Sequence, residues 1–127
     1  MKPEKHSTSR FLRSFRHAWN GFRWFLSSEQ NGRIHIFITI IVIVLGVITK
    51  LNGFEWSLII LCIGLVISGE LFNTALEKIC DFVSPEYHTS IGKIKDMAAA
   101  GVLILSVSVA IVGILIFLPK LLSLYQL

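Results

Sequence analysis

The 127-residue chain is 54% hydrophobic and has a formal net charge of +4 at pH 7. Its mean hydropathy of +0.71, with the apolar residues gathered in long blocks, excludes an ordinary water-soluble domain of this size and indicates lipid as its solvent. The two cysteines, Cys62 and Cys80, fall in one apolar block or its extension, so we expect packing residues rather than a disulfide framework or metal ligands.

The N-terminal segment predicts a helix that lies on the membrane surface. Residues 1–9 are polar and aperiodic, so we expect them to be disordered. Over residues 10–28 a helical period puts aromatic and aliphatic side chains on one face and basic or polar ones on the other, with Trp24 as the exception. A basic helix rich in aromatics is typical of the membrane interface, and this pattern argues against a nucleic-acid partner. Asn31 and Gly32 then predict a turn.

Three apolar blocks predict three membrane-spanning helices, at about 33–51, 56–82 and 94–118. A helix needs roughly 20 residues to cross a hydrocarbon core of about 30 Å, and the first block reaches this length only if Arg33 and Lys50 extend to the headgroups. No small-residue cleavage site follows the first block, so we expect no signal peptide. The fold class is therefore an all-α membrane protein, with one domain over residues 10–127 that contains the surface helix and three transmembrane helices.

The distribution of basic residues predicts the orientation of the chain. Lysine and arginine are retained on the cytoplasmic side of a membrane, and ten of the twelve lie before the first block or between the second and third blocks. We therefore expect the N-terminus inside and the C-terminus outside. The half of the second span that carries Glu70 would then face the cytoplasm, where ATP is.

The second span carries a polar stripe. Its members stand at helical spacing on one side of the helix: Glu70, Asn73, Glu77 and Asp81. A carboxylate at membrane depth costs about 2.5 to 3.5 kcal/mol on insertion scales, so it usually faces a bundle interior and marks function. Asp81 could instead form a solvated ion pair with Lys78 or Lys95.

The predicted topology brings three further polar residues to the level of Glu77: Glu29, Lys95 and Asp96. Carboxylate and amide oxygens suit Mg²⁺, which is usually held by one or two carboxylates plus substrate phosphates, and a lysine can hold phosphate as a point charge. The chain has no Gly-rich phosphate loop and no H-E-x-x-H motif.

Two functions from different classes fit this stripe. One is phosphoryl transfer, because carboxylates, an amide and a lysine at one level suit Mg²⁺ and a bound phosphate. The other is a small oligomeric transporter or channel subunit that uses Glu70 as a proton or cation relay. The gathering of carboxylates at the cytoplasmic edge, rather than along a path through the bilayer, favours the kinase.

Three ordered motifs carry a resemblance to a known family. They are E-L-F-N-T-A-L-E at residues 70–77 with Asp81 four residues on, S-P-E-Y-H at 84–88, and K-D-M-A-A-A-G-V-L at 95–103. With this spacing the chain closely resembles the small prokaryotic diacylglycerol kinases, a family that includes the undecaprenol kinases. The resemblance implies an ATP-dependent lipid kinase, a homotrimer with active sites between subunits, in the bacterial inner membrane and with its site on the cytoplasmic side.

The resemblance also implies roles for individual residues. Glu70 would be the catalytic base, and Glu29 and Glu77 the Mg²⁺ ligands. The implied ATP-binding residues are Arg10, His17, Glu29, Asn73, Glu77, Glu86, Tyr87, His88, Lys95 and Asp96. The implied lipid-binding residues are Trp19, Arg23, Glu70 and Ala99.

Two positions depart from the pattern of the family. His17 stands where some members have a tyrosine at the ATP site, and Ala99 stands where some have a serine near the start of the third span. The Ala99 departure weakens the case for diacylglycerol in particular, and the second and third motifs are mildly closer to those of undecaprenol-type members. Diacylglycerol and undecaprenol both remain open as acceptors at this point.

Overall fold

A computed structural model describes residues 7–86 and 88–125, and these residues form four helices. The helices are α1 (Ser7–Ser28), α2 (Gln30–Ile48), α3 (Gly53–Val83) and α4 (Thr89–Tyr125). Three of them, α2, α3 and α4, are long and apolar enough to cross a membrane. The predicted fold class, an all-α protein with three membrane helices, is confirmed, whereas the orientation of the termini stays a prediction.

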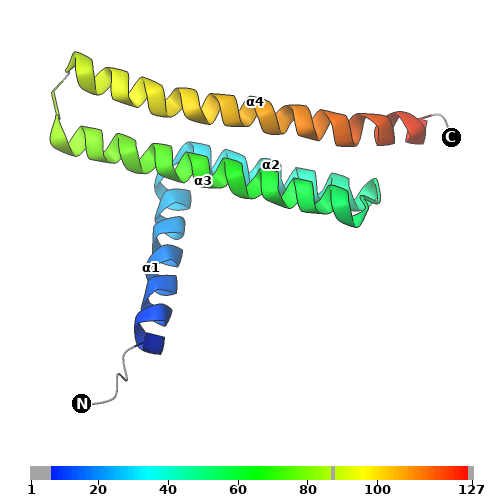
Figure 1. Cartoon of the computed structure of the whole chain (residues 1–127), viewed down its shortest axis with the longest axis horizontal. Helices are drawn as coiled ribbons and strands as arrows, with labels where there is room; N and C mark the ends of the chain where they lie inside the picture. Colours follow the sequence, from blue (N-terminus) through cyan, green and yellow to red (C-terminus); the bar gives the residue numbers. More distant parts are fainter. Residues whose placement is uncertain (1–6, 87, 126–127) are drawn as a thin grey trace.

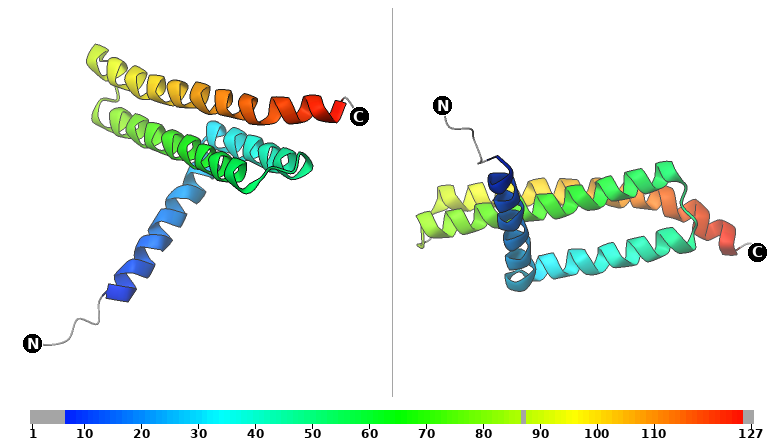
Figure 2. Two further views of the ribbon diagram at one scale, coloured as in Figure 1. Left: turned by 45° about the vertical axis from the view of Figure 1, so that its right-hand side comes forward. Right: turned by 90° about the horizontal axis from the view of Figure 1, so that it is seen from below.

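The three membrane helices lie side by side, and α1 leaves them sideways near the start of α2 (Figures 1 and 2). Consecutive membrane helices run in opposite directions, and α3 has neighbours on two sides, because it packs against both α2 and α4. Contacts of α1 with the bundle are made with α2 and α3. This arrangement leaves the N-terminal part of α1 away from α4 within one chain.

The junction of α1 and α2 differs from the prediction. Helix α1 begins at Ser7 rather than at residue 10, so residues 7–9 are helical, and the break after it is the single extended residue Glu29 (φ −110°, ψ 128°). The turn predicted at Asn31 and Gly32 is wrong, because both lie in the first turn of α2. Gly32 instead permits a close approach: a Cβ atom there would lie 2.8 Å from the ring of Phe25, which is 1% exposed.

The link between α2 and α3 is a short hairpin, as predicted, and local hydrogen bonds define it. Lys50 has a φ of 52°, and Leu51 N donates to Gly46 O at 3.0 Å, the bonding pattern of a Schellman C-cap with lysine in place of the usual glycine. Asn52 then caps α3: its side chain accepts from Glu55 N at 3.0 Å, and the Glu55 side chain accepts from Asn52 N at 2.7 Å. This capping box starts α3 at Gly53, ahead of the predicted residue 56.

The α3–α4 connection is tighter than predicted. Helix α3 ends at Val83, before Pro85, because the residue that precedes a proline is disfavoured in the α region. Helix α4 begins at Thr89 rather than at 94 and continues beyond Pro119, so it is longer at both ends than the predicted span. Three contacts define the antiparallel register of the pair: Asp81 with Lys95, Gly69 with Leu105, and Glu55 with Lys120.

The interior of a single chain is small. Its apolar core cluster is formed by Leu51, Ile59 and Phe117 at the hairpin end of the bundle. In the most apolar stretch of α4 only 6% of the residues are buried. Because such a surface is unfavourable in water, lipid or other protein helices must cover it.

Candidate active site

The polar site is built around Glu70, a carboxylic acid on the buried side of α3. Glu70 is among the most buried polar residues of the described chain, at 6% exposure for the whole residue. The neighbouring Gly69 brings α4 close, because a Cβ atom there would lie 2.7 Å from the Cδ2 atom of Leu105. From the other side, Nε2 of His35 on α2 lies 3.0 Å from Oε1 of Glu70. Glu70 therefore sits where all three membrane helices meet.

One turn further along α3, an amide oxygen lacks a partner. The Nδ2 atom of Asn73 donates to Oε1 of Glu77 at 3.0 Å, and this bond sets the orientation of the amide. Its Oδ1 atom is buried and accepts no hydrogen bond from any residue that the structure describes. Buried polar atoms are nearly always satisfied, so an acceptor oxygen without a partner is unusual at this position.

Glu29 reaches the same end of α3 through an ion pair. Its Oε1 atom lies 3.0 Å from Nζ of Lys78, which also lies 5.8 Å from the ring centroid of Trp24. The cation explains why Trp24 departs from the apolar face of α1, since an aromatic ring attracts an ammonium group above it. Sequence reasoning placed Glu29 near this level of α3, and its pairing with the residue that follows Glu77 agrees with that placement.

Lys95 crosses from α4 to α3 and lies 2.9 Å from Oδ1 of Asp81. The ion-pair alternative for Asp81 is thus confirmed, with Lys95 rather than Lys78 as its partner. Asp81 is largely exposed, so solvent screens this pair. The pair holds Lys95, a cation that could bind phosphate, at the same end of the bundle as Glu77.

No cluster of three or more histidine, cysteine or acidic side chains that could hold a metal occurs among residues 7–86 and 88–125. Both cysteines are free, Cys80 is buried, and Cys62 lines a pocket, as expected for packing residues. Magnesium commonly takes only one or two carboxylates from a protein and completes its shell with phosphates and water. The Mg²⁺ site at Glu29 and Glu77 thus stays a prediction.

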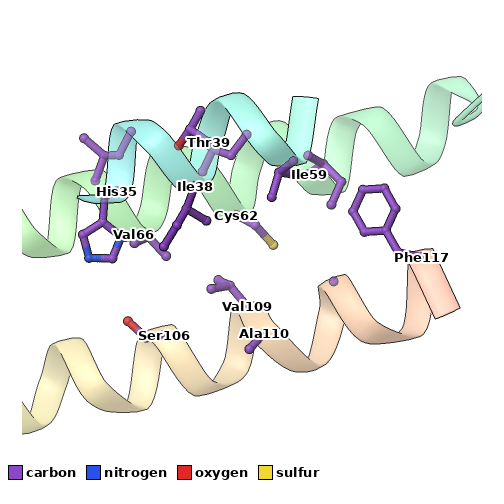
Figure 3. A pocket seen from close by; sticks show the side chains of 14 residues that line it. His35, Ile38, Thr39, Ile59, Cys62, Val66, Ser106, Val109, Ala110 and Phe117 are labelled. Atoms are coloured by element: carbon purple, nitrogen blue, oxygen red, sulfur yellow. The ribbon is translucent and has the colours of Figure 1, made fainter. Parts of the chain in front are cut away.

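An apolar pocket of about 310 Å³ lies between α2, α3 and α4 (Figure 3). His35 stands at one end and Phe117 at the other, and Val66 and Val109 line the walls between them. The imidazole that contacts Glu70 is therefore also the polar end of a hydrocarbon-lined space.

The family profile described as prokaryotic diacylglycerol kinase matches residues 16–117 of the chain. The chain belongs to the prokaryotic diacylglycerol kinase family. It is a lipid kinase, and ATP is its phosphoryl donor. Membership of this family supports phosphoryl transfer, the first of the two predicted functions, over the transporter alternative.

Individual relatives agree with this membership. An undecaprenol kinase of Bacillus subtilis is 37% identical over 120 residues, which cover 94% of this chain and 98% of the relative. A diacylglycerol kinase of Synechocystis sp. is 39% identical over 114 residues, 89% of this chain and 65% of the relative. A diacylglycerol kinase of Escherichia coli is 28% identical over 96 residues, 76% of this chain and 79% of the relative.

Several residues predicted for the lipid kinase site are not brought together within one chain. All four on α1 are exposed, and α1 leads away from α4 (Figure 1): Arg10, His17, Trp19 and Arg23. Glu86 and His88 are exposed in the loop between α3 and α4, and Asp96 and Ala99 are exposed on α4. Tyr87 lies outside the described residues.

Sequence reasoning missed His35. The signal was present, because His35 is the one ionisable side chain in the apolar block at residues 34–49. Glu70 was singled out because a polar group at membrane depth needs a partner. The same argument applies to His35. Only the pairing of α2 with α3 shows that each is the partner of the other.

Proposed function

We propose that this lipid kinase transfers the γ-phosphoryl group of ATP to the hydroxyl of undecaprenol, with Glu70 as the general base. The observation that carries the proposal is a carboxylate of 6% exposure on a membrane helix, followed along the same stripe by Asn73 and Glu77. A lipid alcohol presents its hydroxyl at the membrane interface, and a base set deeper than the nucleotide-binding groups meets it there.

The reaction needs one proton acceptor and in-line geometry. As the lipid oxygen bonds to the γ-phosphorus atom, the bond from that phosphorus to the bridging oxygen of ADP breaks. The hydroxyl proton passes to a carboxylate oxygen of Glu70, and it is later released to solvent. Products are the lipid phosphate, ADP and a proton, so no further reactant is required.

The oxygen atoms one to two turns beyond Glu70 fit a magnesium ion. The fit rests on the unpartnered Oδ1 atom of Asn73 beside the Glu77 carboxylate, since both are hard oxygen donors. Glu77, Asn73 and Glu29 would hold the ion. Bound there, Mg²⁺ would neutralise charge on the transferred phosphoryl group. In the chain as described, Nζ of Lys78 lies 3.0 Å from Oε1 of Glu29, so this lysine would compete with a metal ion for that carboxylate.

The remaining nucleotide contacts are proposed from the family. Lys95 and Asp96 on α4 lie at the Glu77 end of the bundle, and Glu86, Tyr87 and His88 belong to the adjoining loop. Arg10 and His17 lie on the part of α1 that leaves the bundle, so we propose that they reach the nucleotide in a homotrimer, across a subunit boundary. The exposed apolar faces of the membrane helices are consistent with such an assembly.

Undecaprenol is proposed over diacylglycerol for two reasons. The chain aligns with 98% of the length of a relative named undecaprenol kinase, and its Ala99 replaces a serine present in some members of the family. Trp19 and Arg23 would form the wall of the lipid site on α1, with Ala99 on α4 and the base Glu70.

The test is a purified-enzyme assay with labelled ATP and each lipid in turn, read by thin-layer chromatography. A larger kcat/KM for diacylglycerol would overturn the choice of lipid, and no product from either would overturn the kinase assignment.

We further propose that the site lies on the cytoplasmic side of the bacterial inner membrane. The support is the placement of ten of the twelve basic residues at this end of the three spans. A C-terminal reporter that is active only in the cytoplasm should stay silent, and the same reporter at the N-terminus should be active. The reverse pattern would overturn the orientation.

A further inference from the structure

His35 is the group that lies against the base but has no part in the mechanism so far. Its side chain is 21% exposed, that of Glu70 is 7% exposed, and the Nε2 and Oε1 atoms are 3.0 Å apart. The two residues come from different helices, α2 and α3, so their contact depends on the packing of the bundle. In the part of the chain that the structure describes, the other oxygen of Glu70, Oε2, has no hydrogen-bond partner.

The proposed role of Glu70 sets the direction of the contact. A carboxyl group that acts as a base must be ionised, and an ionised carboxylate only accepts hydrogen bonds, so in the proposed mechanism Nε2 of His35 donates to Oε1. A hydrogen bond to a charged acceptor is short and directional, and it restricts the rotation of the carboxyl group. Oε2 is then the oxygen that remains to take a proton from the acceptor hydroxyl.

We propose that His35 is a positioning residue for the catalytic base: it holds Oε1 of Glu70 so that Oε2 faces the lipid hydroxyl. The inference rests on the proposed role of Glu70 and adds a residue that acts through it. His35 also lines one end of the apolar pocket, so the imidazole that contacts the base borders a hydrocarbon-lined space (Figure 3). The proton of the reaction goes to Glu70 and not to His35.

The test compares three substitutions that differ in reach. In His35→Gln the side-chain amide nitrogen takes the position of Nε2 and can still donate to Glu70. In His35→Asn the amide is too short, and in His35→Leu the donor is absent. Lipid phosphorylation is measured in mixed micelles with labelled ATP, and thermal melting and the KM for ATP are recorded for each variant.

Loss of the positioning bond should lower kcat and leave the KM for ATP unchanged. We expect His35→Leu and His35→Asn to lose roughly 10- to 100-fold in kcat, the range seen when the hydrogen-bond partner that orients a metal ligand is removed, and His35→Gln to recover most of it. Thr49→Val is the control at the C-cap of α2, because Thr49 Oγ1 also makes a partly buried hydrogen bond, to Leu45 O at 2.8 Å, but at the other end of this helix from His35. It should alter melting alone.

Two results would overturn the inference. Wild-type kcat in His35→Leu and His35→Asn would mean that Glu70 needs no positioning, and equal losses in His35→Gln and His35→Asn would assign the effect to the ring itself. If His35→Leu fails to fold, the Gln and Asn pair still decides. A wild-type enzyme that makes no lipid phosphate would instead overturn the proposed function, so the two failures are distinguishable.

Discussion

The two ends of α3 both carry polar residues, yet they use them differently. At the hairpin end, Asn52 and Glu55 exchange hydrogen bonds in a capping box, and Glu55 lies 3.0 Å from Nζ of Lys120 on α4. At the other end, Asn73 and Glu77 share one hydrogen bond, but the amide oxygen of Asn73 stays without a partner among the described residues.

The difference teaches that charge alone does not mark a site on a membrane helix. Glu55 and Glu70 are both glutamates on α3, but Glu55 caps the helix and pairs with a lysine, so its hydrogen-bonding capacity is used within the fold. Unpaired buried polar atoms are unfavourable and persist mainly where a ligand or metal will meet them. We therefore propose that the end with Asn73 is the functional one and that the end with Asn52 is structural.

The largest expected effect among three tests of this comparison is on metal use. Glu77→Gln should lower the rate of lipid phosphorylation by up to about 100-fold at low Mg²⁺, because an amide is a weaker Mg²⁺ ligand than a carboxylate. Glu29→Gln should also lower the rate. The measurement is the rate as a function of Mg²⁺ concentration, and raised Mg²⁺ should rescue part of the loss. Unchanged metal dependence in both variants would place the ligands elsewhere.

An effect of intermediate size on the rate is expected from a matched pair of asparagine substitutions, one at each end of α3. Asn73→Ala should lower the rate by roughly 10-fold through loss of the free amide oxygen. Asn52→Ala removes an N-cap and should cost about 1 kcal/mol of stability with unchanged activity. Rates and melting curves are recorded for both variants in the same detergent. An equal loss of activity in the two would contradict the division between a structural and a functional end.

The smallest expected effect concerns Lys78. Lys78→Met removes the ion pair with Glu29, and because Lys78 is 52% exposed the loss of stability should be less than about 1 kcal/mol. With the competing cation gone, the enzyme should reach half its maximal rate at a lower Mg²⁺ concentration. A higher Mg²⁺ requirement would show that Lys78 supports the metal site rather than competing with it.

Sequence reasoning predicted the parts of the molecule that follow from local chemistry. The three apolar blocks gave three membrane helices, and Pro85 predicted the end of α3, because both depend on the properties of one segment. The predicted turn at Asn31 and Gly32 was wrong, since the role of Gly32 depends on the Phe25 ring packed against it from α1. A glycine that permits close packing and a glycine in a turn look the same in one sequence.

In the site, too, features within one helix could be predicted from the sequence, and contacts between helices could not. Glu70, Asn73 and Glu77 share one helix, so their spacing alone placed them on one stripe. The partners of that stripe come from other helices: His35 from α2, and Lys95 from α4. Which of them meets which carboxylate depends on helix packing and register, and no single-sequence pattern encodes those. In the proposed homotrimer, the positions of Arg10 and His17 relative to the site would depend further on neighbouring subunits.

The most direct test of the account is the rate of lipid phosphorylation by Glu70→Gln, with Glu55→Gln as the matched control at the other end of α3. An amide fills the same space as the carboxyl group but cannot accept the hydroxyl proton. We expect Glu70→Gln to keep its nucleotide binding and assembly and to lose about 10²- to 10⁴-fold in rate, while Glu55→Gln keeps the wild-type rate. A Glu70→Gln enzyme that works at nearly the wild-type rate would contradict the account and make Asp96 the next candidate for the base.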